Sequence, residues 1–255
     1  MKKSIQIFIA THKKFNEPVN DIYVPIHVGG KGKDDLGYIK DSTGKNISDK
    51  NSSFCELTGL YWIWKNVKTD IVGLVHYRRY FYKNIIKSKS NILNADDIQK
   101  LMKKYDVVVA PKGYTWGTTV KDSYNKSHIE SDLKECEKIL KKKYPDYGEY
   151  FDKVMNGNCY CPFNMIITRK KIFDAYCKWL FDILLELEKN INLHDGRDNY
   201  NKRVFGFLSE RLFNVWLLKN NKYKVTEQCV FNNEENWIRQ KIEYVTKKVI
   251  KVGRK

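Results

Sequence analysis

The chain lacks the long apolar runs that would place it in a membrane. It contains no stretch of 18 consecutive apolar residues, and its apolar-rich start, residues 5–10, is too short for the hydrophobic core of a secretory signal. We therefore expect a soluble, cytoplasmic protein. With 255 residues, 42% of them hydrophobic, the chain can bury one sizeable core, so we expect a single domain over residues 1–255.

Arginine is scarce in a chain that is otherwise strongly basic. Only 8 of its 47 basic residues are arginine, and the net charge is +17. Neither a recognition motif nor an arginine-rich tract accompanies this charge, so we do not expect nucleic acid as a partner. A non-catalytic module that binds nucleic acid or another anionic polymer stays open as the alternative. An acidic membrane surface or a phosphorylated substrate would suit the charge equally well.

Metal-binding and nucleotide-binding signatures are also absent. The six cysteines form no C-x-x-C pair, because Cys159 and Cys161 are separated by one residue, and without an export signal we expect reduced thiols. The glycine-rich loop over residues 29–51 carries no G-x-x-x-x-G-K-[ST], which excludes a P-loop kinase or ATPase of the usual kind.

Apolar runs alternate with helical periodicity along the chain, which predicts an α/β fold with a mostly parallel central sheet flanked by helices. We expect strands at 5–10, 22–28, 71–75, 106–110 and 164–168, the second of them an edge strand or an irregular segment because it contains Pro25. We expect helices at 53–66, 94–105, 131–144, 169–190 and 202–220. Residues 114–126 read as a loop, and the basic tail 241–255 reads as a strand or a membrane-surface segment.

The helix predicted at 53–66 opens with Ser53-Phe-Cys-Glu56, which fits a capping box. In this interpretation Glu56 serves the helix cap. The strand that follows, 71–75, runs directly into a cationic aromatic cluster, and two of the few arginines stand side by side there. Arginine suits bidentate phosphate contact better than lysine does.

Ligands of open α/β sheets bind beyond the carboxyl ends of the strands. The first strand and the 71–75 strand should therefore present one cationic pocket, rimmed with aromatic rings, that fits the diphosphate of a nucleotide sugar. The residues expected to bind the donor are Thr11, His12, Lys13, His76, Tyr77, Arg78, Arg79 and, from the helix at 202–220, Arg211.

Several stretches resemble one family, the bacterial DUF4422 proteins, over nearly the whole chain. They are IFIATHK (7–13), NISDKNSSFCELTGLYWIWKN (46–66), GLVHYRRYF (73–81), FNMII (163–167), YCKWLFDIL (176–184) and RVFGFLSERLFNVWL (203–217). The resemblance implies a glycosyltransferase with a GT-A-like fold, encoded among capsule and exopolysaccharide genes. It further implies an inverting transfer of galactofuranose from UDP-galactofuranose, in β-linkage, to a growing capsular polysaccharide, exopolysaccharide or O-antigen glycan. UDP-galactopyranose or another UDP-hexose is the alternative donor.

Family context also implies a lipid-linked acceptor and peripheral contact with the inner face of the cell membrane. We expect Trp116 and Asn164 to contact the acceptor. Many GT-A enzymes hold a metal with Asp-x-Asp after a central strand, but His76-Tyr-Arg-Arg79 stands at that place here. We therefore expect no required metal, because the arginine pair can stabilise the departing diphosphate. Mn²⁺ or Mg²⁺ held by Asp195 and Asp198 is the alternative.

Transfer to an acceptor hydroxyl also needs a base. We expect Glu210 in this role, because it lies in a family-like motif without an obvious capping function. Asp198 and Glu56 follow as candidates.

Overall fold

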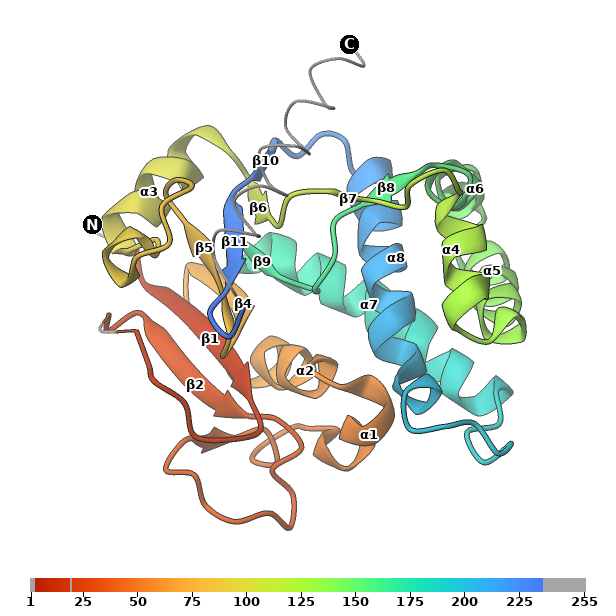
Figure 1. The fold of residues 1–255 in the computed structure, drawn as a ribbon, viewed down its shortest axis with the longest axis horizontal. Coiled ribbons are helices and arrows are strands. Elements are labelled where there is room, and N and C mark those ends of the chain that lie inside the picture. The colour runs from red at the N-terminus through yellow and green to blue at the C-terminus, as the bar shows by residue number, and fades with distance from the viewer. Residues whose placement is uncertain (1–2, 19, 236–255) are drawn as a thin grey trace.

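The computed structural model describes residues 3–18 and 20–235, and its centre is a mixed sheet of nine strands with helices on both faces (Figure 1). This confirms the predicted α/β class. The strand order is β10-β6-β9-β4-β1-β2-β3, and β5 and β11 extend the sheet from β4. The strands are β1 (Ile5–Thr11), β2 (Tyr23–His27), β3 (Ile39–Lys40), β4 (Ile71–His76), β5 (Arg79–Tyr82), β6 (Val107–Val109), β9 (Ile166–Arg169), β10 (Val225–Glu227) and β11 (Cys229–Asn232). A separate two-stranded sheet pairs β7 (Gly113–Tyr114) with β8 (Cys159–Tyr160).

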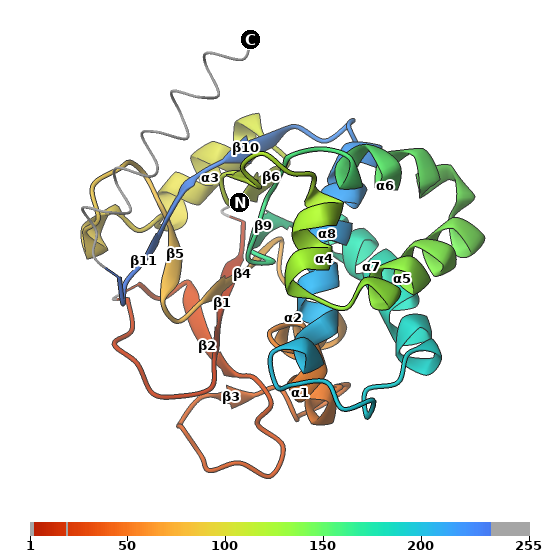
Figure 2. The same cartoon turned by 45° about the vertical axis from the view of Figure 1, so that its right-hand side comes forward.

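Helices α4 to α8 gather on one side of the molecule, which Figure 2 brings forward. The helices are α1 (Asn51–Phe54), α2 (Leu57–Asn66), α3 (Ala95–Lys104), α4 (Val120–Ser127), α5 (Glu130–Lys143), α6 (Gly148–Met155), α7 (Lys170–Asn190) and α8 (Val204–Lys219). Short 3-10 turns complete the chain: η1 (Ser48–Lys50), η2 (Lys89–Asn91), η3 (Pro145–Tyr147) and η4 (Asn201–Arg203). The tail at 241–255, read from the sequence as a strand or a surface segment, lies outside the described residues.

The parallel pairing of β1 with β4 sets the position of the site. Ala10 lies opposite His76 in this pair, and the Tyr77 N–H donates to the Ala10 carbonyl over 3.1 Å. Both strands therefore end at the same edge of the sheet, as expected for parallel neighbours. β9 departs from the parallel arrangement, because it runs antiparallel to both β4 and β6.

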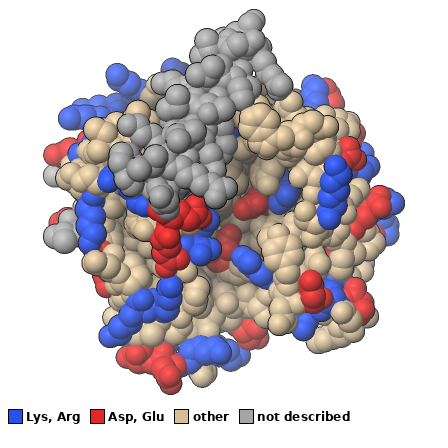
Figure 3. Space-filling view, viewed as in Figure 1, with Lys and Arg blue, Asp and Glu red and all other residues tan. Residues whose placement is uncertain are grey.

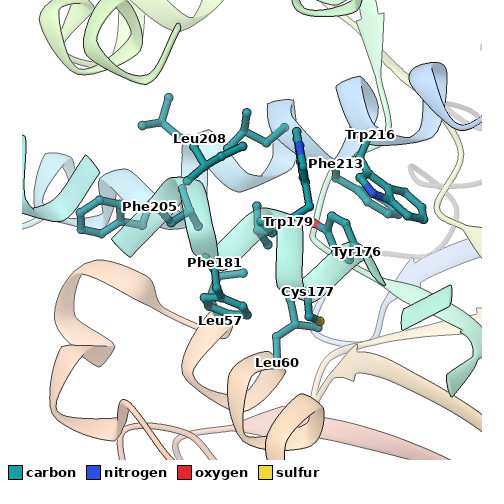
Figure 4. Packing of buried hydrophobic residues seen from close by; sticks show 14 of the residues in the cluster. Leu57, Leu60, Tyr176, Cys177, Trp179, Phe181, Phe205, Leu208, Phe213 and Trp216 are labelled. Atoms are coloured by element: carbon teal, nitrogen blue, oxygen red, sulfur yellow. The ribbon is translucent and has the colours of Figure 1, made fainter. Parts of the chain in front are cut away.

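The core fills both faces of the sheet. One cluster lies between the sheet and α3, and the larger one lies between the sheet and helices α2, α7 and α8. The aromatic stripe of α7 is core as predicted, since Tyr176 and Trp179 are buried. Figure 4 shows these rings and Phe181 of α7 between Leu57 of α2 and Trp216 of α8. This packing fixes α2 and α8 relative to the sheet.

The predicted capping box at Ser53 is wrong. The helix is interrupted at Cys55, whose φ of 52° belongs to the left-handed region, so α1 ends there and α2 begins at Leu57. The Ser53 hydroxyl donates to the Lys50 carbonyl instead, over 3.2 Å. Glu56 therefore makes no cap hydrogen bond at the start of α2, and its side chain is available to the site.

The loop predicted at 114–126 is also largely wrong, because α4 occupies most of it. The Thr119 side chain accepts from the Asp122 N–H and caps this helix. The Asn94 cap of α3 is confirmed, with a complete capping box to Asp97. After β4 the chain stays in the sheet, since Tyr77 and Arg78 form a turn and Arg79 opens the antiparallel strand β5.

The glycine-rich segment 29–51 is ordered around a buried carboxylate. Asp41 accepts hydrogen bonds from the Gly29 N–H (2.8 Å), the Gly30 N–H (3.0 Å) and the Ser48 hydroxyl (2.5 Å). These bonds close the loop onto itself and lead the chain into η1 and α1. The loop thereby carries Asn51 to the edge of the sheet where β1 ends.

Gly73 in the middle of β4 has no room for a side chain. A Cβ there would lie 2.8 Å from the Ile166 carbonyl oxygen of β9 and 2.9 Å from Ile7 of β1. We expect Gly73→Ala to lower the free energy of unfolding by about 1–3 kcal/mol, measured by urea denaturation. Gly113→Ala is the matched control, because its nearest atom would be 3.9 Å away. Equal stabilities of the two variants would contradict the tight packing of β9 on β4.

Candidate active site

A cavity of about 640 Å³ opens at the carboxyl ends of β1 and β4. Five segments meet around it: the end of β1, Val28 after β2, the β4–β5 turn, the junction of α1 with α2, and the η4 segment. On the face shown in Figure 3, basic and acidic side chains surround a hollow near the middle of the molecule. The lining residues are Ala10, Thr11, His12, Val28, Asn51, Ser52, Cys55, Glu56, His76, Tyr77, Arg78, Asn199, Lys202 and Arg203.

Three cationic or ionisable side chains gather around the ring of Tyr77. The His12 ring is perpendicular to it, with the two ring centres 5.3 Å apart. Lys13 Nζ lies 4.9 Å from the centre of the Tyr77 ring, and the Arg78 guanidinium lies 5.7 Å from it. The buried Thr11 hydroxyl donates to the Lys13 carbonyl over 2.6 Å, which turns the chain at this point. The structure thus brings together the two clusters that the sequence separates by more than 60 residues.

Burial lowers the pKa of His12, and the nearby charges of Lys13 and Arg78 lower it further. The imidazole is therefore neutral near pH 7 and offers one hydrogen-bond donor and one acceptor. Glu234, which follows β11, bridges the two cations: its carboxylate lies 3.0 Å from Lys13 Nζ and 3.5 Å from Arg78. These ion pairs are half-exposed, so they add little to stability, and an anionic ligand can take the place of Glu234.

The end of β4 is held by a turn far away in sequence. His76 Nε2 lies 2.7 Å from the carbonyl oxygen of Phe163, so this nitrogen carries the hydrogen. Burial lowers the pKa of His76, although the charge of Glu56 opposes the shift. A neutral imidazole protonated at Nε2 leaves Nδ1 as an acceptor.

Asn164 does not line the cavity, and the structure places it behind Glu56. Its side-chain amide donates to Glu56 Oε1 over 2.7 Å and to the Gly206 carbonyl over 3.2 Å, and its oxygen accepts from the Ser209 hydroxyl over 3.0 Å. Only 4% of the Asn164 surface is exposed. Asn164 therefore supports Glu56 from behind and does not face the cavity. A direct contact with an acceptor, the role expected from the sequence, is not favoured by this geometry.

Glu210 also lies behind the cavity and not among the residues that line it. Its Oε1 accepts from the Phe163 N–H over 2.8 Å, and Oε2 pairs with Arg211 at 3.2 Å. Burial raises the pKa of this carboxyl, while Arg211 and the Phe163 N–H oppose the shift. Arg211 itself is buried against the rings of Tyr124 and Tyr160. It is therefore not positioned on the cavity wall expected from the sequence.

Three further predicted residues, Arg79, Trp116 and Asp198, do not line the cavity. Arg79 packs over the Phe163 ring at 4.5 Å and does not line the cavity. Trp116 is 64% exposed and contacts Tyr114, also away from the cavity. Asp198 accepts from the Asn201 N–H and stands at the start of the η4 segment.

The alternative metal ligand Asp195 is engaged by an arginine. Both of its carboxylate oxygens accept from Arg197, which is also paired with the buried Asp132. This arginine holds the pKa of Asp195 at about 2. Over residues 3–18 and 20–235, no group of three or more His, Cys, Asp or Glu side chains is arranged to hold a metal ion.

Several contributors to the site were not predicted from the sequence, among them Cys55, Lys202, Arg203 and Glu234. Arg203 Nε lies 3.3 Å from Cys55 Sγ, and burial raises the pKa of this thiol to about 11. The Cys55 thiol is therefore neutral near pH 7. The scarcity of arginine could have pointed to Arg203, since it opens one of the motif stretches, whereas Glu234 carries no local signal.

The chain was compared with known families and solved structures. The sequence profile of a family described as "Domain of unknown function (DUF4422)" matches residues 6–221. The apo structure of the WbbM bifunctional glycosyltransferase is similar to this chain, with a TM-score of 0.85 and 30% sequence identity. The match covers 91% of this chain and 46% of that one, so this chain spans a little under half the length of WbbM. No curated protein sequence matches the chain.

His128 supports the η4 side of the cavity from behind. Its ring stacks on Phe207 at 4.1 Å and on Tyr200 at 5.4 Å, next to the segment that carries Lys202 and Arg203. Burial, together with the charge of Arg211, lowers the pKa of His128 to about 4. In the unfolded chain a histidine titrates near pH 6.5, so acidification from pH 6.5 toward 4 favours the unfolded state.

We expect His128→Phe to reduce the loss of stability between pH 7 and pH 5, because phenylalanine keeps the stacking and removes the titrating group. Urea denaturation of wild type and variant at both pH values measures the effect. His194→Phe, the same substitution at an exposed histidine, is the control. Identical pH dependence of wild type and His128→Phe would show that His128 is not the group responsible.

Proposed function

Because the chain belongs to the DUF4422 family and shares its fold with a glycosyltransferase, we propose that it transfers a sugar from a nucleotide-sugar donor to an acceptor hydroxyl. One observation carries the proposal: cations and a carboxylate line the same cavity at the carboxyl ends of β1 and β4. Lys13 lies beside the cavity residue Arg78 at the Tyr77 ring, which suits a diphosphate. Glu56 on the α1–α2 side suits an acceptor hydroxyl.

The proposed reaction is a single displacement. The acceptor oxygen attacks the anomeric carbon, its proton passes to the carboxylate, and the bond between that carbon and the diphosphate oxygen breaks. The electron pair leaves with the nucleoside diphosphate, where Arg78 and Lys13 stabilise the added negative charge. Attack opposite to the leaving group inverts the anomeric centre, which fits the inverting transfer expected from the family resemblance.

We propose Glu56 as the base. It lines the cavity, whereas Glu210 is committed to the Phe163 N–H and to Arg211. Glu210, the first choice from the sequence, stays a candidate together with Asp198. A metal-free mechanism also stays part of the proposal, since Arg78 can supply the positive charge that a metal would bring. Mn²⁺ or Mg²⁺ is the alternative.

The finer assignments rest on the family resemblance. We propose UDP-galactofuranose as the donor, with UDP-galactopyranose or another UDP-hexose as alternatives. A growing, lipid-linked capsular, exopolysaccharide or O-antigen glycan is the proposed acceptor. The enzyme would then work in the cytoplasm at the inner face of the membrane. In the part of the chain that the structure describes, no helix is long and apolar enough to cross a bilayer.

The competing class is a non-catalytic binder of nucleic acid or another anionic polymer. Its support is the net charge of +17. On the face drawn in Figure 3, however, blue and red side chains are interspersed, and no continuous basic surface stands out. This class predicts tight, salt-sensitive binding to generic oligonucleotides and no turnover of a nucleotide sugar.

A thermal-shift assay with a panel of UDP-sugars tests whether the protein binds such a donor. The UDP affinity of arginine variants then tests whether the cations of the cavity hold the diphosphate. We expect Arg78→Gln to weaken UDP binding by roughly 10- to 100-fold, the effect of losing one hydrogen bond to a charged group. Arg79→Gln should have a smaller effect, because Arg79 packs on Phe163 outside the cavity lining. Calorimetric titrations with UDP, in the presence of EDTA and in the presence of Mn²⁺, measure the UDP affinity of both variants.

Lys103→Gln removes the same charge from the exposed end of α3 and is the control. A wild-type protein that binds oligonucleotides but no nucleotide sugar would support the competing class. Binding of UDP that is lost in EDTA and restored by Mn²⁺ would favour the metal-dependent alternative.

Two conservative substitutions distinguish the candidate bases. We expect Glu56→Gln to lower kcat by roughly 10²- to 10⁴-fold while UDP affinity stays unchanged, because only the proton acceptor is lost. Glu210→Gln should keep most turnover, since a glutamine oxygen can still accept from the Phe163 N–H. Steady-state transfer assays give kcat, and UDP titrations give the UDP affinity of each variant. The reverse pattern, with an inactive Glu210→Gln and an active Glu56→Gln, would assign the base to Glu210.

A further inference from the structure

The turn at Phe163 and Asn164 has an unusual backbone. Both residues have positive φ angles, 79° and 52°, a region that side chains other than glycine rarely occupy. Asparagine tolerates this conformation, whereas for a bulky residue such as phenylalanine it is strained. Such a conformation persists only where the surroundings determine it, and here the surroundings are side chains of α8.

Helix α8 holds the turn at three places. Asn214 accepts from the Cys161 N–H over 2.8 Å and donates to the Cys161 carbonyl over 3.0 Å. Glu210 accepts from the Phe163 N–H, and Ser209 donates to the Asn164 side-chain oxygen. The helix therefore fixes both the position and the backbone orientation of the turn.

The Phe163–Asn164 turn itself holds two residues of the cavity wall, His76 and Glu56. The Phe163 carbonyl accepts from His76, and the Asn164 amide donates to Glu56, each over 2.7 Å. The Asn164 amide has a single favourable orientation, because a flipped amide would direct its oxygen at the Gly206 carbonyl and at Glu56. Its second N–H and its oxygen are both engaged in the observed orientation.

We propose that the Phe163–Asn164 turn is a positioning element that sets the tautomer of His76 and the orientation of the Glu56 carboxylate, with Asn164 as its positioning residue. The proposal rests on the proposed function and deepens it. Asn164 is buried and does not line the cavity, so it acts on the reaction only through Glu56. His76 presents Nδ1 as a hydrogen-bond acceptor, suited to a hydroxyl of the donor sugar.

Asn164→Gly removes the amide and leaves a residue that adopts positive φ without strain. We expect kcat to fall about 100-fold, the effect of a misplaced catalytic group, while the affinity for UDP stays at the wild-type value. Ser209→Ala, which removes the hydroxyl that contacts both the Asn164 side-chain oxygen and the Gly206 carbonyl, should give a smaller loss of kcat. Asn156→Gly, at an exposed asparagine after α6, is the matched control with unchanged kcat. A near-normal kcat for Asn164→Gly would overturn the proposal.

Asn164→Asp separates positioning from a general structural role. The introduced carboxyl has the shape of the amide but faces Glu56 without a hydrogen to donate, unless the pair shares a proton. We expect the activity of Asn164→Asp, relative to wild type, to rise as the pH falls from 8 to 6. The same ratio for Asn164→Gly should not change with pH. Equal pH dependence of the two ratios would contradict a hydrogen bond from residue 164 to Glu56.

Nitrogen-15 NMR tests the His76 part without any turnover. We expect His76 at pH 7 to be neutral and protonated at Nε2, and a signal for the Nδ1-protonated or charged form would overturn this assignment. A wild-type protein that binds no nucleotide sugar would refute the proposed function. A wild-type protein that transfers sugar as fast as its Asn164→Gly variant would refute the positioning role alone.

Discussion

The hydrogen bond from the Asn164 amide to the Glu56 carboxylate ties together three parts of the chain that lie far apart in sequence. Glu56 precedes α2, Asn164 precedes β9, and the amide is held in place from α8. These elements are brought together by the aromatic packing of α7 between α2 and α8 (Figure 4). The core packing therefore determines the geometry of the site, because a shift of α8 would move the turn, Glu56 and His76 together.

Lysine and arginine have different places in this molecule. Lysines carry most of the net charge and form exposed or half-exposed pairs with carboxylates, such as Lys141 with Glu137 and Lys143 with Asp182. Arginines instead occupy specific contacts: Arg197 joins two aspartates, and Arg211 lies between two tyrosine rings. The rigid, planar guanidinium suits such positions, which explains why the few arginines are informative when the many lysines are not.

Local patterns predicted much of the fold. The buried strands, the Asn94 cap and the amphipathic α7 all follow from periodicity and capping chemistry within a few residues. The capping box at Ser53 failed for a tertiary reason. Cys55 adopts a positive φ where α1 and α2 meet beside α8, and Glu56 finds its partner in Asn164. A local pattern cannot anticipate a partner that arrives from 108 residues away.

By itself, the sequence determined the α/β class, the cationic ends of β1 and β4, and the family, because each depends on neighbouring residues or on a quoted motif. Only the tertiary structure decided which candidate residues line the cavity and which support it from behind. It placed Glu56 on the wall and Glu210, Asn164 and Arg211 behind it. The physical reason is that burial and hydrogen-bond partners come from segments that meet only in the folded chain. The stretch around His76 and Arg78 supplies one side of the site, and the turn at Phe163 determines how that side is oriented.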